Sequence, residues 1–399
     1  MKKRILVVSH ALELGGAERS LIGLLDMIDP GKYDVDLFLL RQEGELLPEI
    51  PAYVRLLPEI PAYTVLARPM QDTLREGHIL LTGARMMGKL AAGRCNQKHN
   101  YADSAIALEY SHKFTCPLMP KIQPDVEYDL AISFLTPHYF VARKVRAKKK
   151  AAWIHTDYTK VQVDVPSETA MWGAYDRIVS ISDAVPRGFV HTFPSLEDKI
   201  LLMENILPAR LILAQSQAPV SPEEIPPKGI RLLSVGRYCR AKNFDNIPDI
   251  CSRLLKTGLD VYWYIIGFGG DEERIRQKIA EAGMEARVIL LGKKENPYPY
   301  VKACDLYVQP SRYEGKCVTV REAQLLGKPV VITNYATSPS QLEDSVDGMI
   351  VPMDNPGCAA GIAALLRDPE KMQRLSEACK SRDYSNAQEV AKLCKLMED

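Results

Sequence analysis

The sequence predicts an α/β protein with two doubly wound domains, each a parallel sheet covered by helices on both faces. Three observations predict this class. The chain of 399 residues is too long for one ordinary hydrophobic core. Short apolar runs alternate with amphipathic helical patterns, which is typical of buried parallel sheets. A proline-rich segment divides these runs into two sets of six, which favours two domains over one barrel.

The predicted strands are short runs rich in β-branched residues. In the first half they are residues 5–8, 35–40, 130–134, 151–154, 177–181 and 200–203. In the second half they are residues 230–235, 261–266, 287–291, 305–308, 329–333 and 348–351. Residues 214–228 contain four prolines and no periodicity, which is typical of a connection. We therefore predict domains at 1–210 and 230–385, a linker at 211–229 and a terminal helix at 386–399.

Composition excludes several classes of protein. The 51 basic and 50 acidic residues nearly balance, which disfavours a globally basic nucleic-acid binder. The nine cysteines are scattered and never spaced CxxC, so neither a disulfide framework nor a zinc site is expected, and reduced thiols favour the cytoplasm. The apolar run at 5–8 is too short for a secretory signal, and no run of about 18 apolar residues predicts a membrane span.

Two glycine-rich turns follow predicted strands. Gly15-Gly16 comes after the first strand, and Gly267-Phe268-Gly269-Gly270 comes after the strand at 261–266. A strand, a glycine turn and a helix start bring free backbone N–H groups together, which suits a phosphate. Glu272 stands where GxGxxG needs its third glycine, which disfavours a nicotinamide-dependent dehydrogenase. A steric need for glycine explains either turn equally well.

A pair of glutamates follows the predicted strand at 305–308. Glu314 lies beyond the carboxyl end of that strand, where open parallel sheets bind ligands, and Glu322 lies eight positions later. Gly315 allows close backbone approach, and a helix that starts near Cys317 directs its unpaired N–H groups at the same place. The plainer alternative is two solvated glutamates that flank an ordinary helix.

Basic residues follow the strand at 230–235. Arg237 and Lys242, with Arg240 between them, lie in one loop. A forked guanidinium and a flexible ammonium group in one loop are suited to a diphosphate. Ordinary surface charge is the plainer alternative.

Together these features resemble the retaining glycosyltransferases of family 4, which have the two-Rossmann GT-B fold. The resemblance spans essentially the whole chain and is specific for the family, although it says little about the substrate. It rests on Gly15-Gly16, Val235-Gly236-Arg237 with Lys242, Gly267-Phe268-Gly269, the run 303–311, the E-x7-E pair of Glu314 and Glu322, and Gly327-Lys328-Pro329-Val330-Val331.

The resemblance implies a cytoplasmic hexosyltransferase that works without a metal or cofactor, at the inner face of the membrane if its acceptor is lipid-linked. Domain 1–210 would bind a glycan or lipid-linked acceptor, and domain 230–385 would bind a nucleotide sugar, a UDP-sugar in preference to a GDP-sugar. The helix at 386–399 would pack on the first domain. The product would belong to cell-surface polysaccharide synthesis. Asp34-Val35-Asp36 is expected to be ordinary strand-edge polarity and no metal site.

The resemblance also implies a role for each matched position. Arg237 and Lys242 would bind the donor diphosphate, Glu314 the hydroxyls of the transferred sugar, and Glu322 the ribose. The expected catalytic residues are Glu314, His155, Arg237 and Lys242. The expected donor-binding residues are Gly15, Gly16, Arg237, Lys242, Gly267, Glu314, Gly315, Lys316, Cys317, Val318 and Glu322. Lys316-Cys317 departs from the aromatic-glycine pair of many relatives.

A front-face displacement is the expected mechanism. Retaining hydrolases hold two carboxyl groups about 5 Å apart, whereas Glu314 and Glu322 are expected to meet different ends of the donor. Two alternatives stay open: a sugar-nucleotide epimerase of the same fold, and a non-catalytic nucleotide-binding partner of another transferase.

Two basic regions bear on the acceptor. Residues 79–94 place Ile79, Leu80, Met86, Met87 and Leu90 on one helical face, and six of the eight residues 143–150 are basic. An interfacial helix near anionic lipid is one interpretation. A core-facing helix beside a solvated charge run is the other, and it is slightly favoured.

Overall fold

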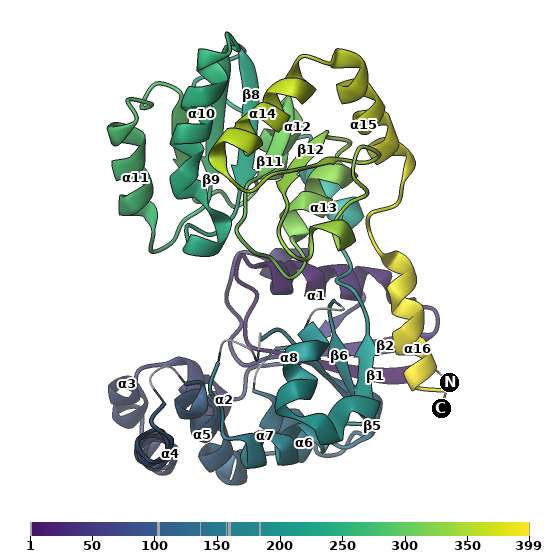
Figure 1. Cartoon of the computed structure of the whole chain (residues 1–399). Coiled ribbons are helices and arrows are strands. Elements are labelled where there is room, and N and C mark those ends of the chain that lie inside the picture. Colours follow the sequence, from purple (N-terminus) through teal and green to yellow (C-terminus); the bar gives the residue numbers. More distant parts are fainter. Residues whose placement is uncertain are drawn as a thin grey trace. The chain divides into compact units, whose positions relative to one another are not determined.

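The computed structural model describes residues 2–101, 104–135, 137–156, 158, 161–182 and 185–398. The chain forms two compact units (Figure 1). The first contains Met1–Ile206 and Ala387–Asp399, and the second contains Leu207–Asn386.

The first unit contains a seven-stranded parallel sheet in the order β3-β2-β1-β4-β5-β6-β7. Its strands are β1 Lys3–Ser9, β2 Tyr33–Leu39, β3 Arg55–Leu56, β4 Tyr128–Ser133, β5 Ala147–Ile154, β6 Arg177–Ser180 and β7 Ile200–Leu202. The central strand β1 has no exposed side chain from Ile5 to Ser9, because neighbouring strands and helices on both faces enclose it. The six runs predicted for this half all form strands, and only the two-residue β3 lies outside them.

Helices cover both faces of this sheet. They are α1 Gly16–Met27, α2 Pro61–Thr64, α3 Met70–Arg75, α4 Ile79–His99, α5 Ile106–Thr115, α6 His138–Lys144, α7 Val165–Trp172 and α8 Val185–Thr192. The last helix, α16 Val390–Leu396, also belongs to this unit. Its Leu393 is fully buried, and its Lys392 ammonium donates a hydrogen bond of 2.9 Å to the carbonyl oxygen of Leu202 in β7. The chain therefore ends on the unit in which it begins.

The second unit contains a six-stranded parallel sheet in the order β10-β9-β8-β11-β12-β13. Its strands are β8 Ile230–Val235, β9 Val261–Ile266, β10 Val288–Gly292, β11 Leu306–Gln309, β12 Val330–Thr333 and β13 Met349–Val351. Its helices are α9 Ala209–Gln215, α10 Ile247–Lys256, α11 Glu272–Glu281, α12 Tyr298–Ala303, α13 Val318–Leu325, α14 Asn355–Leu366 and α15 Pro369–Ser381.

Successive residues along these strands point to opposite faces of the sheet, and each face has its own core. Leu232 and Trp263 belong to one buried cluster, whereas Leu233 and Tyr264 belong to the other. This two-sided burial explains why the strands read as continuous apolar runs. The predicted class of two doubly wound α/β domains is confirmed.

Each sheet reverses its strand order next to its first strand. In the second unit, β8 pairs with β9 on one side and with β11 on the other. Connections leave such a point in opposite directions and open a crevice at the carboxyl ends of the two strands, where doubly wound sheets bind ligands. The loops after β8 and β11 therefore lie where a doubly wound sheet binds its ligand.

The predicted linker at 211–229 differs from the structure. The boundary lies after Ile206, and residues 211–229 belong to the second unit. Ile212 of α9 is fully buried in a cluster with Leu207 and Tyr298. Further along, Glu224 accepts a hydrogen bond of 2.5 Å from the hydroxyl of Tyr300. Prolines remove helical periodicity from this segment, but its side chains still pack on the second unit and form hydrogen bonds with it.

Candidate functional site

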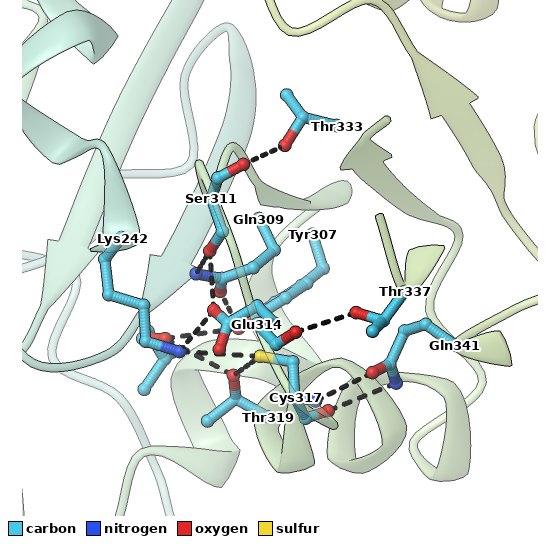
Figure 2. A network of polar contacts seen from close by, with 11 residues as sticks. Lys242, Tyr307, Gln309, Ser311, Glu314, Cys317, Thr319, Thr333, Thr337 and Gln341 are labelled. Atoms are coloured by element: carbon cyan, nitrogen blue, oxygen red, sulfur yellow. Dashed lines mark hydrogen bonds and ion pairs between the residues drawn. The ribbon is translucent and has the colours of Figure 1, made fainter. Parts of the chain in front are cut away.

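A polar network lies at the carboxyl ends of β8 and β11 in the second unit (Figure 2). Lys242 comes from the turn after β8, and Glu314 comes from the loop between β11 and α13. The Nζ atom of Lys242 lies 2.6 Å from Oε1 of Glu314, and the two side chains are only 17% and 11% exposed. The predicted residues of the two loops therefore do meet, in an enclosed ion pair.

A chain of hydrogen bonds holds the Glu314 carboxylate from the side of the sheet. The hydroxyl of Tyr307 in β11, fully buried, donates to Oε1 of Gln309 at 2.9 Å. The amide nitrogen of Gln309 donates to the hydroxyl oxygen of Ser311 at 3.0 Å, and that hydroxyl donates to Oε1 of Glu314 at 2.6 Å. Thr337 donates to the backbone carbonyl of Glu314 at 2.7 Å. The carboxylate is thus oriented from core to surface before any ligand binds.

The surroundings of Lys242 keep its ammonium group charged. Burial by itself lowers the pKa of Lys242, but the adjacent Cys317 and Glu314 raise that pKa above its usual value. The ammonium also donates to the Cys317 sulfur at 3.7 Å. Burial, followed by the Glu314 charge, raises the pKa of Cys317, so this thiol stays protonated at neutral pH.

The start of α13 is partly occupied by the chain itself. The backbone N–H of Cys317 donates to Oε1 of Gln341 at 2.7 Å, and the Gln341 amide returns a bond of 3.2 Å to the Cys317 carbonyl oxygen. In this structure the Cys317 amide is therefore paired within the chain, and the predicted contacts of residues 315–318 with the donor remain a prediction. Val318 begins α13 and is half-buried against the cluster around Ile212.

Gly315 and Lys316 differ in their surroundings. No atom outside its chain neighbours lies within 4 Å of the point where a Cβ on Gly315 would be, so this backbone borders open space. The ammonium of Lys316 donates to the carbonyl oxygen of Ser340 at 2.8 Å. The residue that departs from the family pattern therefore ties its loop to the segment that follows β12.

Glu322 lies inside the protein. It is buried in α13, and Oε1 accepts a hydrogen bond of 3.0 Å from the buried hydroxyl of Tyr298 in α12. With Glu314 also enclosed, the alternative of two solvated glutamates is wrong. The predicted contact of Glu322 with a ribose remains a prediction, because its side chain is enclosed by residues of this chain.

Arg237 contrasts with Lys242. It follows β8 after Gly236 and is exposed, and within the described part of the chain it makes no hydrogen bond or ion pair. The two cations of the predicted clamp are therefore in different states: Lys242 has a counterion, and Arg237 has its fork of N–H donors available to an anion.

Gly267 has a steric reason to be glycine. Its φ is +155°, and a Cβ there would overlap the carbonyl oxygen of Gly236. The two loops run against each other, since the N–H of Tyr238 donates to the Phe268 carbonyl oxygen at 2.8 Å. The steric alternative thus accounts for this glycine, and its contact with a donor remains a prediction.

The other predicted residues belong to the first unit. Gly15 is the N-cap of α1 and Gly16 its first residue, at the carboxyl end of β1. A Cβ on Gly15 would meet the carboxylate of Glu18, a flexible side chain. Glycine is therefore less strictly required here than at position 267.

His155 follows β5 and packs on Phe134, with the ring centroids 5.1 Å apart. Burial lowers the pKa of His155 to about 4, so the imidazole is neutral at pH 7. Its Nε2 atom is buried and has no hydrogen-bond partner among the described residues. The ring lines a cavity of about 100 Å³ together with Trp172 and the buried carboxyl groups of Glu109 and Glu168.

Asp34 and Asp36 take part in ion pairs within the first unit. Asp34 lies 3.7 Å from the Lys2 ammonium, and Asp36 lies 2.6 Å from the Arg55 guanidinium. Asp36 also accepts a hydrogen bond of 2.6 Å from Tyr128. In the part of the chain that the structure describes, no three His, Cys, Asp or Glu residues gather in an arrangement that could hold a metal ion. The same part contains no helix long and apolar enough to cross a membrane.

Sequence reasoning missed the residues that support Glu314 and Cys317. Ser311 stood inside a quoted motif without a role, and its place three residues before Glu314 was an available signal. Gln341 and Thr337 gave no signal, because they lie in a loop beyond the next strand of the sheet.

Comparison with known proteins matches the second unit to one family. Residues 219–382 match the family described as "Glycosyl transferases group 1". The N-acetylgalactosamine-N,N'-diacetylbacillosaminyl-diphospho-undecaprenol 4-alpha-N-acetylgalactosaminyltransferase of Campylobacter jejuni is 30% identical over 162 residues, 40% of this chain and 44% of that protein. The amylovoran biosynthesis glycosyltransferase AmsK of Erwinia amylovora is 31% identical over 145 residues, 34% of this chain and 35% of that protein. The chain thus spans less than half the length of these two curated relatives.

Solved structures match over the whole chain. HepE of Anabaena in complex with UDP has a TM-score of 0.64 and 16% identity, with 100% of both chains covered. TarM has a TM-score of 0.67 and 13% identity, with 100% of this chain and 99% of that chain covered. The chain therefore has the GT-B fold of these structures, and residues 219–382 of its second unit are similar to the group 1 glycosyltransferases.

Proposed function

We propose that this protein transfers a glycosyl group from a nucleoside-diphosphate sugar to a glycan or lipid-linked acceptor, with retention of anomeric configuration. The observation that carries the proposal is the enclosed Lys242–Glu314 pair at the carboxyl ends of β8 and β11, with the exposed Arg237 in the same loop as Lys242. This place suits a ligand that has both a diphosphate and sugar hydroxyls. The match of the same unit to the group 1 glycosyltransferases supports it.

The proposed donor is a UDP-sugar, with a GDP-sugar as the second choice. The solved HepE complexes contain UDP and UDP-glucose, and a TarM complex contains UDP. The proposed setting is polysaccharide synthesis, which the names of the relatives from amylovoran and lipopolysaccharide core biosynthesis support.

The proposed chemistry is a front-face displacement. The bond between the anomeric carbon and the diphosphate oxygen breaks, and the acceptor oxygen bonds to the same face of that carbon. The acceptor proton passes to the departing diphosphate. Arg237 and Lys242 stabilise the negative charge that develops on this group. Removing such a donor typically raises the activation barrier by about 3–4 kcal/mol.

Glu314 is proposed as a contact to the sugar hydroxyls and not as a nucleophile. Its Oε1 already accepts from Lys242 and from Ser311, which lowers its nucleophilicity. The neutral His155 is proposed as a hydrogen-bonding group near the reacting sugar, since Nε2 is unpartnered among the described residues. The two cations supply the charge that a metal would otherwise supply, so activity is expected to persist in a chelator.

The test is a donor and acceptor screen with the purified full chain. UDP- and GDP-sugars are offered with soluble oligosaccharides or polyprenyl-diphosphate sugars, and nucleotide release is measured with and without chelator. The expected result is acceptor-dependent release of UDP, with a product whose anomeric configuration by NMR matches the donor. Glu314→Gln should lower turnover at least tenfold (about 1.4 kcal/mol), whereas Arg374→Ala, at a surface arginine of α15, should not.

Each alternative has its own outcome in this screen. Interconversion of the donor sugar without an acceptor would identify an epimerase. A nucleotide sugar that raises the melting temperature but is never turned over would identify a non-catalytic binding protein. Inversion of configuration would contradict the proposed retention and the front-face mechanism, but not glycosyl transfer from a nucleotide sugar.

A further inference from the structure

Helix α4 of the first unit has two apolar faces, and only one of them is covered. The covered face contains Leu81, Ala84, Gly88 and Ala92, at helical spacing, and all four are buried. It packs along α5, which lies beside α4 in Figure 1. Gly88 permits this close approach, because a Cβ there would come within 2.8 Å of the Tyr110 carbonyl oxygen.

The opposite face exposes large apolar side chains. Ile79, Leu80, Met86, Met87 and Leu90 are each between 57% and 76% exposed. They recur at helical spacing and form one stripe, which we call the α4 stripe. No other helix in the described part of the chain exposes more than one large apolar residue. The slightly favoured expectation of a core-facing position is therefore wrong for these five residues.

Single exposed apolar residues are ordinary, but a contiguous stripe is typical of an interaction site. A stripe that met only water would favour aggregation. We therefore expect a binding partner to cover the α4 stripe, and the charges around the stripe indicate the kind of partner.

The charges of α4 all have one sign. Its 21 residues include Arg85, Lys89, Arg94 and Lys98 and no aspartate or glutamate. The Arg85 guanidinium is held by the carbonyl oxygens of Val65 and Arg68. The other three are exposed, and Arg94 and Lys98 continue the face of the stripe by one and two turns.

Acidic groups beside the stripe alter this charge little. On α3 and the turn after it, Asp72 and Glu76 are exposed, and Glu76 is bound by Arg68 through two hydrogen bonds of 2.7 and 2.5 Å. On α5, Glu109 is buried. The surface around the α4 stripe therefore presents a net positive charge.

We propose that the α4 stripe docks on an anionic lipid bilayer. The apolar side chains enter the boundary between headgroups and acyl chains, and Lys89, Arg94 and Lys98 reach the anionic headgroups. A protein partner could cover the apolar residues, but the one-signed charge over 21 residues favours a uniformly anionic surface. The proposal does not depend on the proposed reaction, because it concerns a surface of the first unit alone.

The experiment is flotation of the full chain with vesicles of phosphatidylcholine, with or without phosphatidylglycerol. The expected result is flotation with the anionic vesicles at low salt and loss of flotation as salt rises. The triple variant Lys89→Gln/Arg94→Gln/Lys98→Gln should lower the partition coefficient roughly a hundredfold. The variant Met87→Glu/Leu90→Glu should lower the partition coefficient by a factor of about ten or more.

The matched control is Leu118→Glu/Leu213→Glu, at two leucines that are about half exposed outside the stripe. This variant should float like the parent, and circular dichroism should show that all variants are folded. The proposal is overturned if the parent does not bind anionic vesicles at low salt, or if Met87→Glu/Leu90→Glu binds them equally well. A parent dimer in ultracentrifugation that this variant converts to a monomer would assign the stripe to a second copy of the chain.

Discussion

The ammonium nitrogen of Lys242 lies 2.6 Å from Oε1 of Glu314, although 72 positions separate the two residues. The pair joins the loops after β8 and β11, and both side chains are largely enclosed. Lys242 therefore has a counterion before any donor arrives. The pair itself is neutral, so the exposed Arg237 in the same loop as Lys242 provides an unpaired positive charge for an incoming diphosphate.

Breaking this pair from one side should destabilise the second unit. Lys242→Ala leaves the Glu314 carboxylate enclosed without its cation, which should cost about 3 kcal/mol of unfolding free energy. Glu314→Gln combined with Lys242→Ala removes both charges, so the double variant should lose less than the sum of the single variants. A coupling energy of about 2 kcal/mol is expected from urea unfolding of all four proteins. Additive losses would mean that the pair contributes no specific stability.

Removing the Arg237 side chain should weaken ligand binding and leave the stability of the fold unchanged. Arg237 has no partner in the described part of the chain, so Arg237→Ala should change the unfolding free energy by less than about 0.5 kcal/mol. The affinity for UDP in titration calorimetry should fall about tenfold, because one hydrogen bond to a charged group contributes about that much to binding. Arg237→Lys should restore it only in part, because an ammonium cannot bind bidentately. Unchanged affinity in Arg237→Ala would exclude this residue from the donor site.

The glycine at position 267 should tolerate no side chain. Its positive φ and the Gly236 carbonyl oxygen leave no room for a Cβ, so Gly267→Ala should destabilise the protein by at least roughly 2 kcal/mol. Gly270→Ala is the matched control, because a Cβ there meets no atom within 4 Å. Thermal unfolding of both variants measures the difference. Equal melting temperatures would show that the two loops can separate without cost.

Periodicity predicted most of the fold, because burial on both faces makes each strand a continuous apolar run. The predicted run at 230–235 coincides with β8. The site was predicted in part. Glu314 and Lys242 were named because each follows a strand, but their direct pairing depends on how two distant loops meet. Gln341 was unpredictable for the same reason, since it reaches Cys317 across 24 positions.

Helix α4 shows why an apolar pattern can indicate the wrong face. Its covered face contains small residues such as Ala84, Gly88 and Ala92, which carry little hydrophobic signal but let two helices approach closely. Its exposed face contains larger residues such as Leu80 and Met87, which carry the stronger signal. Hydrophobicity alone therefore predicts that the larger apolar residues face the core, whereas in the structure they are exposed.

His138 makes the first unit sensitive to acid. Its Nδ1 atom shares a hydrogen bond of 2.7 Å with the hydroxyl of Ser133, and its ring lies 4.6 Å from that of Trp172. Burial lowers the pKa of His138 to about 3, whereas a histidine in an unfolded chain has a pKa of about 6.5. Between these values the unfolded state takes up a proton that the folded state refuses. The contribution of His138 to the unfolding free energy is therefore fully present above pH 6.5 and is lost as the pH falls. This loss is about 2 kcal/mol from pH 7 to 5.

Replacing His138 isolates this contribution from opposing ones. Burial raises the pKa of Glu168 to about 7, so its folded carboxyl takes up a proton first and adds stability as the pH falls toward 4.5. That effect is common to the parent and to His138→Asn and cancels in their difference. In a Trp263→Phe background, the two remaining tryptophans both report on the first unit. Urea unfolding at pH 7 and pH 5 should show that His138→Asn loses about 2 kcal/mol less than its parent. An identical loss in both proteins would mean that His138 is protonated in the folded state, and that its burial does not exclude the charge.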